Sequence, residues 1–147
     1  MEIERKFLPK SLPHNLSEYS FHQIEQGYLN TDPVIRIRRE DEDYYLTYKS
    51  KGLLAREEYN LPLTKEAYLH LLPKIDGRLI VKKRYLIPIA SGLTIELDIF
   101  GGELAPLILA EVEFSTEDEA NAFTPPEWLG DDVTYSMDYH NSVLSQR

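Results

Sequence analysis

Pairs of charged residues two positions apart recur from the first residues of the chain to its last third. The sequence opens with Glu2, Glu4 and Lys6, and later contains pairs such as Arg36 and Arg38. In an extended strand, residues two apart point to the same side of the sheet. Carboxylates are hard oxygen ligands for Mg²⁺ or Mn²⁺, and Arg and Lys bind phosphate oxygens. Strands that share one such surface would therefore suit a divalent cation beside a polyanion.

The charges of this candidate face are sorted by strand. Its basic members are Lys6, Arg36, Arg38, Lys49, Lys51, Arg56, Lys82 and Arg84, and its acidic members are Glu2, Glu4, Glu58, Glu96, Asp98, Glu111 and Glu113. The face is nearly neutral, although the chain has 16 basic and 25 acidic residues and a net charge of −9. For any one strand, an ordinary solvated sheet face explains the alternation equally well. The segregation of acids and bases by strand favours a ligand site.

Alternating apolar and polar residues predict the elements that must position these charges. Eight segments are predicted as strands, at 2–8, 24–29, 34–40, 44–51, 56–61, 79–87, 93–100 and 107–114. Helices are predicted at 64–75, with Thr64 as its cap and its regular part ending near Leu72, at 120–123 behind a capping box of Thr116 and Glu119, and at 133–144.

Eight antiparallel strands can close into a barrel. With the charged face inside, the apolar face points outward and has to be covered by helices or by a partner subunit, which makes a homodimer possible. The expected fold is mainly β, an eight-stranded closed antiparallel barrel that forms a charged tunnel, with helices packed outside. The 147 residues suit a single domain over 1–147.

Composition excludes several classes of protein. The chain has no cysteine, so disulfide frameworks, thiolate zinc sites and cysteine nucleophiles are absent. No apolar leader and no apolar run long enough to span a membrane occur, so we expect a cytoplasmic protein with no membrane partner. The acidic balance argues against nucleic acid as a partner. The four histidines lack metal-ligand spacing and are interpreted as surface or packing residues.

The order of these motifs resembles one known family. Glu2-Ile3-Glu4-Arg5-Lys6 is similar to the ExExK pattern that opens the CYTH domain of the triphosphate tunnel metalloenzymes. The later motifs that resemble this family, in order, are Gln26-Gly27-Tyr28-Leu29, Arg36-Ile37-Arg38, Thr47-Tyr48-Lys49, Arg56-Glu57-Glu58, Lys82-Lys83-Arg84-Tyr85, Glu96-Leu97-Asp98, Glu111-Val112-Glu113 and Tyr139-His140-Asn141. ExExK alone is a weak signal, but the whole series in register is specific.

The resemblance implies an eight-stranded tunnel that binds a triphosphate with Mg²⁺ or Mn²⁺, and the chain is most similar to the small bacterial inorganic triphosphatases. The expected reaction is hydrolysis of tripolyphosphate to pyrophosphate and phosphate. Other activities of the family stay open: thiamine or nucleoside triphosphatase and class IV adenylate cyclase. A non-catalytic polyphosphate-binding module is a further alternative. Where the family pattern carries a basic residue before the tyrosine of the last helix, this chain has Met137-Asp138, so a basic contact from the tail is in doubt.

Roles for the charged residues follow as a hypothesis. We expect the metal to bind Glu2, Glu4, Glu111 and Glu113, with Asp98 or Glu96 close by, because crowded carboxylates need a cation to stay ionised. We expect the triphosphate to bind Lys6, Arg36, Arg38, Lys49, Lys51, Arg56, Lys82 and Arg84. A second metal ion, Glu2 or Glu58 would activate the attacking water, and Lys82 would protonate the leaving oxygen.

Overall fold

The computed structural model describes residues 1–146, which form one long antiparallel sheet and a few short helices. The strands are β1 (Glu2–Leu8), β2 (Phe21–Thr31), β3 (Val34–Glu40), β4 (Asp43–Lys49), β5 (Ala55–Arg56), β6 (Glu58–Pro62), β7 (Asp76–Pro88), β8 (Thr94–Phe100), β9 (Ile108–Glu113) and β10 (Asp131–Asp132). The α-helices are α1 (Lys65–Leu71), α2 (Glu117–Ala122) and α3 (Asn141–Leu144). Six single-turn 3₁₀ helices connect them, η1 (Leu16–Glu18), η2 (Leu72–Lys74), η3 (Ala90–Gly92), η4 (Gly102–Leu104), η5 (Glu127–Leu129) and η6 (Met137–Tyr139).

The sheet curls back on itself into a nearly closed barrel. Its strand order is β10-β1-β9-β8-β7-β2-β3-β4-β6, and β5 pairs with the start of β1. Because only Glu57 separates β5 from β6, the chain that pairs with β4 at one end of the sheet also reaches β1 at the other. The predicted antiparallel barrel is confirmed.

The strands differ from the prediction at two places, the segment 56–61 and the short additional strand β10, which pairs with the end of β1. The segment 56–61, predicted as one strand, is two strands that break at Glu57, so nine strands rather than eight surround the interior. At the break, the backbone N–H of Ser50 donates to the carbonyl of Glu57, and the N–H of Glu57 donates to Ser50 Oγ. The local backbone groups are thus satisfied outside the sheet ladder, which lets the strand change partner from β4 to β1.

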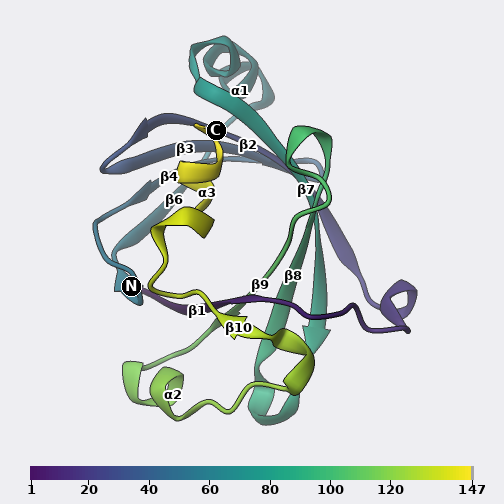
Figure 1. The fold of residues 1–147 in the computed structure, drawn as a ribbon. Coiled ribbons are helices and arrows are strands. Elements are labelled where there is room, and N and C mark those ends of the chain that lie inside the picture. Colours follow the sequence, from purple (N-terminus) through teal and green to yellow (C-terminus); the bar gives the residue numbers. More distant parts are fainter. Residues whose placement is uncertain (147) are drawn as a thin grey trace.

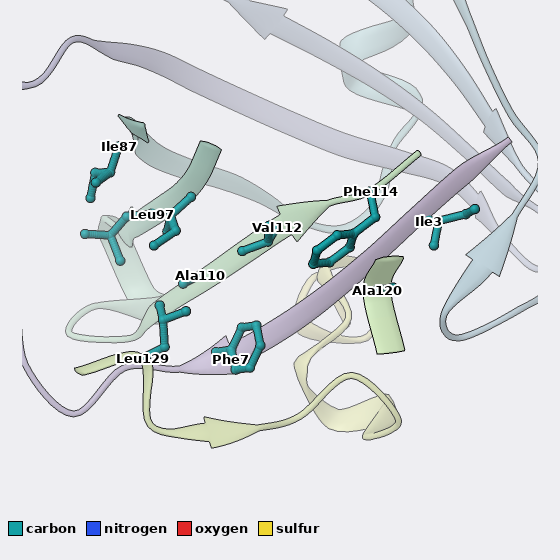
Figure 2. Packing of buried hydrophobic residues seen from close by; sticks show 10 residues of the cluster. Ile3, Phe7, Ile87, Leu97, Ala110, Val112, Phe114, Ala120 and Leu129 are labelled. Carbon is teal, nitrogen blue, oxygen red and sulfur yellow. The ribbon is translucent and has the colours of Figure 1, made fainter. Parts of the chain in front are cut away.

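The main apolar core lies outside the barrel wall. Inward charges on β1, β8 and β9 leave Ile3, Phe7, Leu97 and Val112 on the opposite side, where they are buried. Helix α2 and the turn at Leu129 cover this layer (Figure 2). In Figure 1, α1 and α2 lie outside the ring of strands on different sides of it. The predicted arrangement, with helices outside a charged interior, is confirmed.

Both of the predicted helix caps are present. Thr64 Oγ1 accepts a hydrogen bond from the N–H of Ala67 at the start of α1 (3.1 Å), and Thr116 Oγ1 accepts one from Glu119 at the start of α2 (3.1 Å). Within residues 1–146, none of the helices has the length and apolar character that a membrane crossing requires.

The predicted tail helix 133–144 is wrong for 133–136, and His140 interrupts the rest. The chain instead runs along β1: the N–H of Val133 donates to the carbonyl of Lys6, and the N–H of Lys6 donates to Thr134 Oγ1 (3.0 Å). Only η6 and α3 are helical, and this yellow segment crosses the ring of strands in Figure 1. Leu144 of α3 is fully buried with Tyr28, and both belong to a second apolar cluster. The tail therefore covers one end of the barrel.

Candidate functional site

A polar cavity of about 220 Å³ lies inside the barrel. It is lined by residues from every strand of the barrel wall and from the tail: Glu2, Glu4, Lys6, Tyr28, Val34, Arg36, Arg38, Glu40, Lys49, Arg56, Glu58, Asn60, Lys82, Arg84, Glu96, Glu111, Glu113, His140, Asn141 and Ser142. The charged residues predicted from strand alternation all line it, except Lys51 and Asp98. The alternation along the strands therefore predicted the residues that line one cavity, rather than a face exposed to solvent.

Lys51 lies outside this cavity. Strand β4 ends at Lys49, so the alternation does not continue to residue 51. The side chain of Lys51 is 86% exposed, its Nζ lies 3.8 Å from Asp32, and the residue lines a second cavity beside the tunnel. Lys51 is therefore not part of the tunnel wall, because the strand that positions Lys49 ends two residues before it.

Asp98 lies in the wall, behind two cations. Its carboxylate accepts hydrogen bonds from Arg84 Nε and Nη2 (2.8 and 2.9 Å) and lies 2.8 Å from Lys82 Nζ. It is fully buried and does not reach the cavity. Burial acts to raise its pKa, but Arg84 and Lys82 outweigh that effect and hold the pKa below its ordinary value. Asp98 thus neutralises and orients two cations, and its oxygens are not free for a metal ion.

The carboxylates of β1 and β9 gather on one side of the cavity. Glu4 pairs in register with Glu113, and Lys6 with Glu111. Burial, and then the charges of Glu111 and Glu2, raise the pKa of Glu4 well above its ordinary value. Burial also opposes ionisation of Glu111, but Lys6 and Arg84 hold the pKa of Glu111 well below its usual range. This side therefore contains a crowded acidic pair that an added cation would stabilise in its fully ionised form.

A donor set of this kind fits a divalent cation. All the groups are hard oxygen ligands, and the Glu4 carboxyl, when protonated, donates a hydrogen bond to the carboxylate of Glu111. Among residues 1–146, no three carboxylate or imidazole groups are already gathered as a metal cage. Mg²⁺ is usually held by one or two carboxylates together with substrate phosphates and water. Two carboxylates beside a phosphate site are therefore enough to complete such a shell.

Glu2 and Glu58 meet around one lysine. Lys49 Nζ lies 3.0 Å from Glu2 and 3.2 Å from Glu58, and Arg56 Nε lies 3.3 Å from Glu2. Burial acts to raise the pKa of Glu2, but Lys49 and Arg56 outweigh it and lower that pKa. Glu2 is therefore an ionised group at the junction of the acidic and basic sides. Glu58 makes one of these contacts and is more exposed than Glu2.

The basic side of the cavity lacks enough counter-charge of its own. Arg36 is 5% exposed, its Nη2 donates to Thr47, and its buried Nε has no hydrogen-bond partner among residues 1–146. Burial, and then the charges of Arg36 and Arg84, lower the pKa of Arg38 to about 9. A buried donor without an acceptor beside crowded cations is costly, and an anion in the cavity would relieve both costs. This part of the site is built for a polyanion.

Lys82 is the most deeply buried cation of the site, at 1% exposure. Burial lowers its pKa to about 7 in spite of the adjacent Asp98. Its Nζ also donates to Asn141 Oδ1 (3.1 Å) and lies 5.4 Å from the centre of the Phe100 ring. An ammonium held this way, with a pKa near neutrality, is suited to give a proton to a leaving group.

Several residues of the cavity were not found from the sequence. His140 was interpreted as a surface or packing residue, yet it is 8% exposed and lines the cavity. Burial, and then the charges of Lys6 and Arg56, lower its pKa to about 4, so its imidazole is neutral. As far as residue 146, the tail contributes His140, Asn141 and Ser142 to the lining, and no Lys or Arg. The only signal for them was the Tyr139-His140-Asn141 motif.

Comparison with known proteins agrees with this geometry. An inorganic triphosphatase of Nitrosomonas europaea is 42% identical over 147 residues, covering 98% of this chain and 96% of that protein. An inorganic triphosphatase of Acetivibrio thermocellus is 35% identical over 149 residues, covering 97% and 92%.

Solved structures give the same result. A crystal structure of an inorganic triphosphatase matches with a TM-score of 0.74 at 39% identity, over 100% of this chain and 95% of that one. A putative adenylyl cyclase from Hippeastrum with a dominant triphosphatase activity matches in fold, with a TM-score of 0.63 at 18% identity over 82% of this chain and 83% of that one. The model of the CYTH domain matches residues 1–134. With the tunnel, its charge pattern and this match in agreement, the chain belongs to the CYTH domain family.

Proposed function

We propose that this protein hydrolyses inorganic triphosphate to pyrophosphate and phosphate, with Mg²⁺ or Mn²⁺ as its cofactor. The CYTH triphosphatases depend in general on divalent metal ions. The observation that carries the proposal is the buried cation cluster of Arg36 and Arg38, with an unpartnered donor, facing the carboxylates of β1 and β9 across one cavity. The inorganic triphosphatases that this chain resembles support the choice of substrate.

Different residues of the tunnel are proposed to bind the phosphates and the metal ion. Arg36, Arg38, Arg84 and Lys6 would bind and orient the phosphates by charge-assisted hydrogen bonds. Glu4 and Glu111, with Glu2, Glu96 and Glu113 nearby, would hold the metal ion, which neutralises charge on the phosphates when bound. Because burial excludes water from most of this wall, each electrostatic contact is stronger than it would be in bulk solvent.

Two side chains are proposed to transfer protons in the reaction, Glu58 as the acceptor and Lys82 as the donor. Glu58 makes a single contact, to Lys49, so it is better placed than the doubly paired Glu2 to accept a proton from the attacking water. Lys82 would donate a proton to the leaving pyrophosphate oxygen. Lys49 and Arg56 would complete the phosphate-binding set on this side of the cavity.

A second cavity favours one alternative. A space of about 600 Å³ adjoins the tunnel and shares Lys49, Arg56 and His140 with it, while Leu53 and Val143 add apolar walls. An organic group attached to a triphosphate would fit such a space. The alternative function is therefore hydrolysis or cyclisation of an organic triphosphate such as a nucleoside or thiamine triphosphate.

A substrate panel separates these functions. Phosphate release is measured from tripolyphosphate, ATP, thiamine triphosphate and pyrophosphate with Mg²⁺ and with Mn²⁺, and cyclic AMP is followed in the ATP sample. We expect tripolyphosphate to be hydrolysed at least about 100-fold faster in kcat/KM than the others, since the polar tunnel recognises phosphates alone. A preference for an organic triphosphate would favour the alternative. Metal-dependent binding of tripolyphosphate without any turnover would make the protein a binding module.

Replacing Arg38 by Ala tests the phosphate-binding wall. We expect the KM for tripolyphosphate to rise about 10- to 100-fold, which is the contribution of one hydrogen-bonded ion contact. Arg39→Ala is the matched control, because Arg39 is the next residue of β3 but points outward, is 44% exposed and pairs with Glu42. An unchanged KM in Arg38→Ala, measured by phosphate release, would remove β3 from the substrate site.

Three wider expectations from the sequence stay proposals. We propose that residues 1–147 act as one domain, that the protein works in the cytoplasm, and that it forms a homodimer. The exposed Tyr59 and Leu61 on the outer side of β6 are apolar groups that a second copy would cover. Light scattering of the purified protein tests the homodimer directly.

A further inference from the structure

Two uncharged amides stand inside the ionic tunnel wall. Gln26 of β2 is fully buried, and Asn141 opens α3 at the covered end of the barrel. Gln26 Nε2 donates to Asn141 Oδ1 over 3.3 Å, and Lys82 Nζ donates to the same oxygen over 3.1 Å. Each of these two amides therefore contacts both a candidate phosphate-binding cation and the other amide.

These amides connect cations from different strands. Gln26 Oε1 accepts from Arg38 Nε over 2.9 Å, so the chain of contacts runs from Arg38 through Gln26 and Asn141 to Lys82. From Lys82 it continues through Asp98 to Arg84. Strands β3, β2 and β7 are neighbours in the sheet, and the tail thus adds a side-chain link between β2 and β7 on the inner face of the barrel.

The orientation of both amides is fixed by their partners. Arg and Lys only donate hydrogen bonds, so each of them needs an oxygen acceptor. Arg38 therefore takes the oxygen of Gln26, which turns the nitrogen of Gln26 toward Asn141. Lys82 and Gln26 then both donate to the oxygen of Asn141, in addition to the contact of Lys82 with Asp98 and the hydrogen bond from Gln26 to Tyr28 Oη. A residue at position 141 without an oxygen acceptor would remove one acceptor from each of these two buried donors and would leave their side chains less firmly held.

We propose that Asn141 is a positioning residue, which holds the ammonium of Lys82 and, through Gln26, the guanidinium of Arg38 in the geometry that the reaction needs. This inference rests on the proposed triphosphatase function. Its structural consequence is that the active site is complete only when α3 is docked on the barrel. The docking itself is supplied by apolar packing, because Leu144 is fully buried in the cluster that contains Tyr28 and Ile80.

Asn141 is not the cap of α3, because the cap position is His140 and Asn141 is the first helical residue. A capping side chain would bond to a backbone N–H of the first helical turn. Here the recorded contacts of the Asn141 side chain go to β2 and β7, and its backbone carbonyl accepts from Ser145. The side chain of Asn141 therefore contacts residues of the tunnel wall, whereas its backbone carbonyl forms a hydrogen bond of the helix.

The test compares Asn141→Leu with Asn141→Asp in the full chain, using tripolyphosphate and Mg²⁺. Leu has a similar size but no acceptor, whereas Asp keeps the acceptor oxygen. For Asn141→Leu we expect kcat to fall about 10- to 100-fold with KM within about threefold of wild type, because a misaligned proton donor affects the reaction more than ground-state binding. Asn141→Asp is expected to retain most of the wild-type kcat.

Two further variants separate positioning from helix docking. In a Lys82→Met background, Asn141→Leu is expected to cause little additional loss of kcat, because the oxygen would have no ammonium left to hold. Leu144→Ala disturbs the packing of α3 and leaves the amide in place, so we expect it to lower the melting temperature more, and kcat less, than Asn141→Leu does.

Each outcome decides the proposal. Unchanged kcat in Asn141→Leu, an equal fall in the Lys82→Met background, or the same kcat loss in Leu144→Ala would each overturn the positioning role. Those results leave the proposed triphosphatase function intact, since wild-type turnover is measured in the same assay. Absence of turnover in the wild-type protein would overturn the proposed function and this inference with it.

Discussion

Glu111→Gln is expected to lower the metal-dependent kcat/KM for tripolyphosphate by at least about 10³-fold, since the metal ion would lose a charged ligand and the phosphates would lose the charge neutralisation that a bound metal ion would supply. Gln keeps the shape of the side chain and removes only its charge. Glu111 is 6% exposed, hydrogen-bonds to Glu4 and lies 3.8 Å from Lys6 and 3.9 Å from Arg84. No other carboxylate of the cavity has this combination of an acidic partner and two nearby cations.

Binding experiments distinguish loss of the metal site from loss of the whole tunnel. Without metal, Glu111→Gln is expected to bind tripolyphosphate at least as tightly as the wild type, because a negative charge has left a cavity that binds an anion. Titration calorimetry with and without EDTA measures this, and the melting temperature reports on folding. Turnover within about tenfold of wild type would exclude Glu111 from the metal site, since a lost ligand costs far more than that.

Glu42→Gln is the matched control for the change of charge. Glu42 lies in the turn between β3 and β4, and its side chain is 91% exposed. A charge change at such a position is expected to alter activity by less than about twofold, because solvent screens it from the tunnel. A comparable loss in Glu42→Gln would show that overall charge, rather than the site, governs the assay.

The barrel was predictable because its interior is charged. In most sheets the alternation of polar and apolar residues shows only which face is solvated. Here the segregation of acids on β1 and β9 from bases on β3 and β7 showed that the polar face is an organised surface. Closure of the barrel followed from strand number, and it does not depend on the exact end of any one strand.

The errors come from tertiary contacts that local pattern cannot show. Alternation continues through Lys51 in the sequence, but the strand stops at Lys49 because Ser50 turns to meet the carbonyl of Glu57. The tail between 133 and 144 has helical spacing, yet hydrogen bonds to β1 hold its first part extended. In both places a distant partner satisfied the backbone differently from what neighbouring residues indicated.

The same holds for the site: some of its residues follow from the local pattern of a strand, and others depend on contacts between distant parts of the chain. Inward-facing charges could be listed from strand phase alone, whereas His140 and Asn141 reach the cavity only because α3 folds over one end of the barrel. Their residue types gave no periodic signal. Asp98 has the phase of a ligand, but the pairing of β7 with β8 sets it opposite Arg84, which claims both oxygens. The alternation along a strand predicts which face of the sheet a side chain is on. Only the register of strand pairing shows which neighbouring side chain forms a hydrogen bond with it.

Asp98→Asn is expected to lower the free energy of unfolding by about 3–5 kcal/mol, the usual cost of removing one partner of a buried ion pair. Asp98 is fully buried and receives two hydrogen bonds from Arg84 and the ammonium of Lys82. Asn is neutral, so Lys82 would lose the carboxylate beside it, and Arg84 would keep its longer contacts to Glu96 and Glu111 (3.5 and 3.9 Å). Because domains are stable by only about 5–15 kcal/mol, this loss would be visible in a urea titration as a much lower midpoint.

The double variant Asp98→Asn with Lys82→Met tests the cause of that loss. Removing Lys82 also removes the cation that has lost the carboxylate beside it, so we expect the double variant to be more stable than the sum of the single effects by about 0.5–3 kcal/mol. Asp131→Asn, an exposed change on β10, is the control and is expected to stay within about 0.5 kcal/mol of wild type. If Asp98→Asn costs less than about 1 kcal/mol, solvent or rearranged side chains already compensate Arg84 and Lys82. In that case these two cations would not depend on Asp98, and the tunnel wall could hold its charges without a fixed internal counter-ion.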